Sequence, residues 1–81
     1  MKTRDLFEAA LAMARGLAIA SLEVDQDGGD SHARVTFVLE GAGARELALE
    51  YRTGKAEANV SLLKMCVEHL KRRMWAAVDA R

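Results

Sequence analysis

Cys66 and His69 come closest, by residue type and spacing, to a reactive or metal-binding pair. They stand three positions apart in a stretch with helical periodicity, so both side chains would lie on one helix face. A structural zinc site takes four protein ligands and a catalytic site three, and only His32 and acidic residues remain to complete a set. A thiol nucleophile would need a helix start or an exposed turn. We therefore expect no metal, no cofactor and no enzymatic activity.

The acidic segment 25–30, DQDGGD, superficially resembles a calcium-binding loop. A loop of that kind beginning at Asp25 needs a glutamate at its twelfth position, where this chain has Thr36. Two glycines next to aspartates are typical of a tight turn between strands. We therefore interpret this segment as a hairpin turn and not as a cation site.

Three residues before the C-terminal helical stretch are candidates for binding a small anion or nucleotide: Arg52, Thr53 and Lys55. The dipeptide Gly-Lys at 54–55 is not a phosphate loop, because the required earlier glycine and following hydroxyl residue are missing. A looser role remains, since the free N–H groups at a helix N-terminus attract anions.

The basic run 71–73, together with Lys64, is the other candidate surface, for nucleic acid or an acidic protein. The run is formed by Lys71, Arg72 and Arg73. Cations near a helix C-terminus are also favourable for the helix alone. The net charge is zero, but residues 1–50 hold nine acids and five bases whereas residues 51–81 hold three and seven. This asymmetry allows a local basic patch or the packing of oppositely charged halves.

These candidates have to be positioned by a long C-terminal helix, predicted over residues 59–80 with Asn59 as its N-cap. No proline interrupts it. Its apolar residues recur at spacings of three and four and so share one face. They are Val60, Leu63, Val67, Leu70, Met74 and Ala77, with Leu62, Cys66 and Trp75 at the sides.

A shorter helix is predicted from about residue 5 to residue 15. Thr3 or Asp5 can cap it, and Asp5 followed three residues later by Glu8 resembles a capping box. Gly16 is placed to end it in a left-handed conformation. The two residues before Thr3 are expected to be loose.

Alternating apolar residues predict three strands, over residues 17–25, 32–40 and 45–51. The inward-facing sets are Ala20, Leu22 and Val24; Ala33, Val35, Phe37 and Leu39; and Leu47, Leu49 and Tyr51. The predicted architecture is α+β, with a helix, a three-stranded antiparallel sheet and a second helix in one domain, residues 1–81, both helices covering one sheet face. Double-stranded-RNA-binding domains share this order, but they place a lysine cluster where this chain has only Lys55.

Hydrophobic residues make up 51% of this chain of only 81 residues. That is more apolar surface than the small core of such a chain needs. We therefore expect self-association, with a homodimer as the first guess, through Met65, Leu70, Met74 and Trp75, since aromatics and methionines are enriched at interfaces. The single cysteine excludes an internal disulfide and favours a reducing, cytoplasmic setting. No apolar run has the roughly 20 residues of a membrane span.

Five segments, taken together in this order, resemble a family of short phage and bacterial proteins catalogued only as a domain of unknown function. They are residues 3–6, Gly16, residues 34–40, residues 51–54 and residues 70–71. The resemblance implies a phage or prophage origin and carries no known activity. Together with the missing catalytic set, it favours a small binding protein that occupies a host protein or a small anionic ligand. The alternative is a nucleic-acid-associated regulator that uses the basic C-terminal helix.

Overall fold

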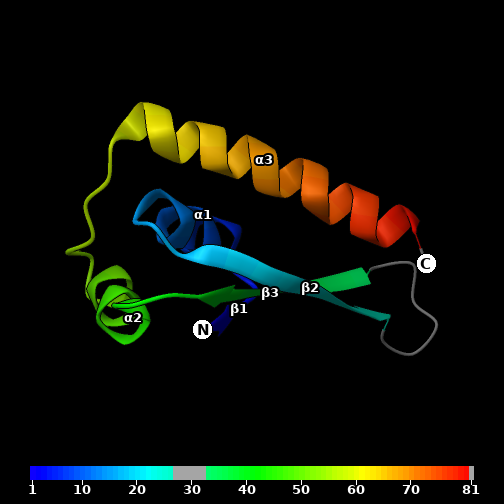
Figure 1. Ribbon diagram of the computed structural model, residues 1–81, viewed down its shortest axis with the longest axis horizontal. Helices are drawn as coiled ribbons and strands as arrows, with labels where there is room; N and C mark the ends of the chain where they lie inside the picture. Colours follow the sequence, from blue (N-terminus) through cyan, green and yellow to red (C-terminus); the bar gives the residue numbers. More distant parts are fainter. Residues whose placement is uncertain (27–32, 81) are drawn as a thin grey trace.

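The computed structural model describes residues 1–26 and 33–80. Within them the chain forms β1 (Lys2–Thr3), α1 (Leu6–Ala14), β2 (Ala18–Gln26), β3 (Ala33–Glu40), α2 (Ala44–Arg52) and α3 (Val60–Asp79). The strands make one antiparallel sheet in the order β1-β3-β2, and α1 and α3 lie on the same side of it (Figure 1). The α+β architecture is thus confirmed. His32 and most of the predicted turn fall in positions 27–32, outside the described residues.

The third predicted strand is wrong, because residues 45–51 belong to helix α2. The alternating pattern predicted that Leu47, Leu49 and Tyr51 share the inward face of a strand. In the structure Leu47 is buried, whereas Leu49 is 64% exposed. Leu47 and Tyr51 are four residues apart, which puts them on one side of a helix and allows both to pack inward. Most of the segment consists of good helix formers, and Gly43 leads into it with a φ of 83°. The resulting order of elements also differs from that of a double-stranded-RNA-binding domain.

Strand β1 supplies the third strand instead, so the expectation of a loose N-terminal segment is also wrong. Lys2 pairs with Val38 and Thr3 with Phe37, and the backbone N–H of Leu39 donates to the carbonyl of Met1 at 2.9 Å. A strand of two residues is too short to show any periodicity. It forms because the edge of β3 offers unpaired backbone groups that another segment can satisfy.

Strand β2 contains a bulge at Ala20. Ile19 and Ser21 pair with consecutive residues of β3, so Ala20 is an extra residue without a partner. The bulge changes which side chains face inward: Ile19 before it and Leu22 and Val24 after it are half-buried, whereas Ala20 is exposed. The prediction for Leu22 and Val24 agrees with the structure, and the prediction for Ala20 does not. On β3, the buried alternation of Val35, Phe37 and Leu39 is as expected.

Helix α1 is the central element of the core. Ala9, Ala10 and Ala12 are completely buried and Leu11 nearly so. Figure 1 shows α1 between the sheet and α3, and α2 packs against it as well. Alanines carry so little side chain that three neighbouring elements can approach the backbone closely. α1 therefore contacts all three strands and both of the other helices.

Both ends of α1 are capped by side-chain and backbone groups. The Asp5 carboxylate accepts from the backbone N–H groups of Phe7 and Glu8 at 2.9 and 3.2 Å. The backbone N–H of Asp5 donates to the hydroxyl of Thr3 at 3.0 Å, so Thr3 occupies the place that a capping box gives to the glutamate. At the other end Gly16 has a φ of 100° and the N–H of Leu17 returns to the carbonyl of Ala12 at 2.9 Å, which completes a Schellman motif.

Helix α3 begins as predicted, with the Asn59 side chain accepting from the N–H of Leu62 at 3.0 Å. Part of its predicted stripe is in the core: Leu70 is 0% exposed, and Val67 and Cys66 are buried. Val60, expected on the same face, is 79% exposed at the start of the helix. In the same turn Leu63 is half-buried against the core, so the turn packs through Leu63 and leaves Val60 in solvent; Figure 1 shows α3 lying along α1 and the sheet.

Candidate functional site

The outer flank of α3 carries two exposed apolar residues that do not belong to the core. Met65 is 68% exposed and Leu62 is also exposed, whereas Cys66, one helical turn after Leu62, is buried. A helix with one buried face ordinarily presents charged and polar residues on the others. Exposed methionine and leucine at a spacing of three therefore mark this flank as a surface that can take a partner.

A shallow groove of about 520 Å³ runs along this flank. Its apolar part combines Met13 of α1 with residues of α3, and charged residues form its edge. The α3 groove, as we define it, is lined by Met13, Leu62, Lys64, Met65, Cys66, Glu68, His69 and Arg72. Its size and mixed lining suit an apolar side chain inserted from another protein and charges paired around it.

The residues expected to form the self-association surface do not lie together. Leu70 is fully buried inside its own chain, so it is not available to a partner, and Met74 is half-buried. Met65 lines the groove, while Trp75 is 61% exposed outside it. The sequence pattern could not separate these residues, because apolar positions on adjacent sides of a helix look alike until a neighbour covers one side.

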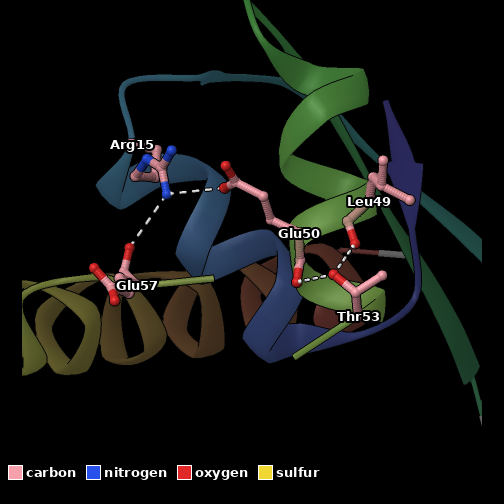
Figure 2. Close-up of polar contacts among 5 residues, drawn as sticks. All are labelled: Arg15, Leu49, Glu50, Thr53 and Glu57. Carbon is pink, nitrogen blue, oxygen red and sulfur yellow. Dashed lines mark hydrogen bonds and ion pairs between the residues drawn. The ribbon is translucent and has the colours of Figure 1, made fainter. Parts of the chain in front are cut away.

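The predicted anion site at residues 52–55 is organised differently from the expectation. Thr53 caps the C-terminus of α2, and its hydroxyl lies within hydrogen-bond distance of the carbonyls of Leu49 and Glu50, at 2.9 and 3.2 Å (Figure 2). Lys55 is exposed, and its backbone N–H donates to the carbonyl of Glu50. Thr53 and Lys55 thus lie at the C-terminal end of α2, where the partial negative charge of the helix end does not favour an anion.

The loop that follows α2 is held by Arg15 (Figure 2). Its Nη1 lies 3.3 Å from Oε2 of Glu50 in an ion pair and donates at 3.2 Å to the carbonyl of Glu57. Both charged side chains are about 40% exposed, so the ion pair contributes less than about 1 kcal/mol. Its consequence is positional, because it ties the end of α1 to α2 and to the segment leading into α3.

Arg52, the third residue of the predicted anion site, lies with Arg45 at a pocket of about 470 Å³ between β1, α1 and α2. We call it the β1–α1–α2 pocket; it is lined by Met1, Lys2, Glu8, Ala44, Arg45, Ala48 and Arg52. Sequence reasoning missed this arrangement because it treated residues 45–51 as a strand. The available signal was the spacing of seven between the two arginines, which places them on one side of a helix.

A second contact joins α2 to the start of α1. The Tyr51 hydroxyl donates at 2.8 Å to Oδ2 of Asp5, the residue that caps α1. This hydrogen bond raises the pKa of Tyr51 to about 12, with smaller contributions from burial and from the negative charges of Asp5 and Glu8. The phenol is therefore protonated, and acts as a donor, throughout the neutral range.

The basic residues of α3 do not form one continuous surface. Lys64, Lys71, Arg72 and Arg73 are all exposed, but consecutive residues of a helix point about 100° apart. Lys71 is 3.9 Å from Glu68 in an exposed ion pair. Lys64 and Lys71 share a flank with Trp75, whereas Arg73 points elsewhere.

Cys66 and His69 both line the α3 groove, where the thiol is buried and the imidazole half-buried. Among the described residues, no three His, Cys, Asp or Glu side chains gather in a way that could hold a metal ion. Within the same residues, no helix combines the length and the apolar character needed to cross a membrane.

Comparisons with protein-family models, with curated proteins and with solved structures found no match for this chain.

Proposed function

We propose that this chain is a small, non-enzymatic binding protein that self-associates through the α3 groove and acts by occupying a partner. The observation that carries the proposal is the pair of exposed apolar residues, Leu62 and Met65, beside a groove with an apolar lining. Burying such a surface would remove apolar area from water at a gain of roughly 25 cal/mol per Å².

Charges at the edge of the groove support a second copy of the chain as the first occupant. Glu68 lies one helical turn after Lys64 and one before Arg72. In a two-fold contact the same patch meets itself, with the two helices antiparallel. If the two-fold axis passes near residue 66, each Glu68 would face Lys64 of the other copy, while the two Met65 side chains, next to the axis, fill the apolar parts of the groove.

The resemblance to short phage and bacterial proteins favours a phage or prophage origin and a cytoplasmic host protein as the further partner. Trp75 is the exposed residue best suited to that contact, because a large aromatic side chain outside the groove stays available after self-association.

The test is the oligomeric state of Met65→Asp, measured by native mass spectrometry and by light scattering after size exclusion. The wild type is expected to be a dimer and Met65→Asp a folded monomer, because a buried unpaired carboxylate is costly. Val60→Asp is the matched control, since Val60 is exposed on the same helix but does not line the groove. A wild-type monomer at all concentrations would refute self-association. A dimer formed by Met65→Asp would place the interface elsewhere.

A nucleic-acid-associated regulator is the second candidate, favoured by the exposed Trp75 on the same flank as Lys64 and Lys71. An aromatic ring with adjacent cations can stack on a base and contact phosphates. Binding of a single-stranded oligonucleotide should then weaken steeply with salt and be lost in a variant with Lys64 and Lys71 changed to glutamine. Binding that does not respond to either change would exclude this function.

A further inference from the structure

Glu8, in the first turn of α1, is a largely buried residue whose carboxylate makes no hydrogen bond or ion pair with the described residues. The residue is 8% exposed. A capping box would use this side chain to accept from the backbone N–H of Asp5, but Thr3 accepts that hydrogen bond instead. The helix dipole favours an acid at this position, and among the described residues neither Glu8 oxygen is a completely buried atom without a partner, so the carboxylate can still accept hydrogen bonds from a ligand.

Glu8 lines the β1–α1–α2 pocket, whose wall also holds Lys2, Arg45 and Arg52. Lys2 is already paired with Glu23 at 3.2 Å. Among the described residues the guanidinium groups of Arg45 and Arg52 have no partner, and neither lies within 4.0 Å of Glu8. The pocket thus keeps two cations and one anion in the same wall without letting them neutralise one another.

This separation matches a ligand with two different ends. A guanidinium presents parallel N–H donors that suit a phosphate or carboxylate, whereas a carboxylate accepts only. We propose that the β1–α1–α2 pocket binds a small anionic ligand that carries N–H donors away from its anionic group, as a guanine nucleotide does. Its phosphate would be held by Arg45 and Arg52, and the donor edge of its base by Glu8.

Size and lining narrow the choice to a ligand of this kind. The pocket volume of about 470 Å³ lies within the range of small-molecule sites and well above what a single inorganic anion fills. Ala44 and Ala48 give the wall an apolar part against which a flat ring can lie. Guanine presents two adjacent N–H donors to the two oxygens of a carboxylate, whereas adenine presents one donor beside an acceptor that a carboxylate repels.

The first test needs no ligand. If Glu8 is kept for binding, Glu8→Gln should unfold at the same temperature as Glu46→Gln, because each variant loses only the small dipole contribution of a first-turn carboxylate. Glu46→Gln is the matched control, since Glu46 is an exposed glutamate in the first turn of α2 and should lose only a small dipole contribution. A lower unfolding temperature for Glu8→Gln than for Glu46→Gln would show that the carboxylate stabilises the fold, and would overturn the proposal.

The second test is calorimetric titration with GMP, AMP and inorganic phosphate. GMP should bind more tightly than AMP, and Glu8→Gln should weaken GMP binding by roughly 10-fold to 100-fold while leaving phosphate binding unchanged. Arg45→Gln and Arg52→Gln should weaken both, and Arg34→Gln, an exposed cation on β3, should change neither. Equal binding of GMP and phosphate, or no binding of any of the three at millimolar concentration, would overturn the proposal.

The β1–α1–α2 pocket shares no residue with the α3 groove. The pocket proposal therefore does not depend on self-association, and monomeric protein can be used for both tests.

Discussion

Changing Leu70 to alanine should lower the free energy of unfolding by about 3–4 kcal/mol. Leu70 is 0% exposed and belongs to the cluster formed by α1, the sheet and α3. The substitution removes three carbon atoms from water-free surroundings, which at about 0.8 kcal/mol each amounts to about 2.4 kcal/mol. Incomplete collapse of the surrounding side chains adds a cavity term that brings the total to about 3–4 kcal/mol.

That loss is a large share of the total free energy of unfolding expected for an 81-residue chain. At about 0.05–0.15 kcal/mol per residue, the whole fold is stabilised by about 4–12 kcal/mol. Since each kcal/mol shifts the melting temperature of a domain this size by about 4–8 °C, the variant should melt about 12–32 °C lower. Urea unfolding followed by far-UV circular dichroism measures the same loss, with an unchanged dependence on urea concentration.

Met65→Ala is the matched control, because Met65 lies on the same helix but is exposed. Its stability should stay within about 0.5 kcal/mol of the wild type when the protein is dilute. The stability of the wild type and of Leu70→Ala should be measured at a low and at a high protein concentration. The loss caused by Leu70→Ala should not depend on concentration, because Leu70 packs within its own chain. If the loss of stability appears only in concentrated samples, Leu70 lies in a contact between subunits, and its assignment to the core of its own chain is refuted.

Three further predictions concern contacts at the ends of helices. Tyr51→Phe removes the hydrogen bond to Asp5 and should cost about 1 kcal/mol in urea unfolding. Because the pKa of Tyr51 is raised from 10.0 to about 12 in the folded chain, its contribution is complete below pH 10 and is lost as the pH rises to about 12. An alkaline loss of the same size in Tyr51→Phe would assign that loss to another group. Gly16→Ala should cost about 1–2 kcal/mol, since the φ of 100° at this position is unfavourable for a residue with a Cβ; equal thermal stability would contradict the Schellman ending of α1. Asn59→Ala should cost about 1 kcal/mol and speed the amide exchange of Leu62, with Ser61→Ala as an almost neutral control.

Local signals in the sequence determined helices α1 and α3 and the two main strands. Asp5, Gly16 and Asn59 mark helix ends because their own backbone or side-chain chemistry satisfies groups that a helix leaves unpaired. The alternation in β3 identified its buried face because a central strand buries every second residue. These features need only neighbouring residues, so no knowledge of the rest of the chain was required.

Tertiary packing decided the features whose local pattern was ambiguous or absent. Residues 45–51 satisfy a strand pattern and a helix pattern equally, and the position of α1 selected the helix because Leu47 and Tyr51 then face it together. β1 exists only because β3 has an edge to pair with, and the bulge at Ala20 exists only because Ile19 and Leu22 must face the same core.

The same distinction applies to the candidate sites. The sequence by itself identified α3 as amphipathic and rich in apolar residues, but only burial separates Leu70 in the core from Met65 in the groove. Glu8, Arg45 and Arg52 come from two helices that are far apart in the chain, so no spacing could group them. They share a pocket because α2 packs on α1, a long-range contact that residue periodicity cannot specify.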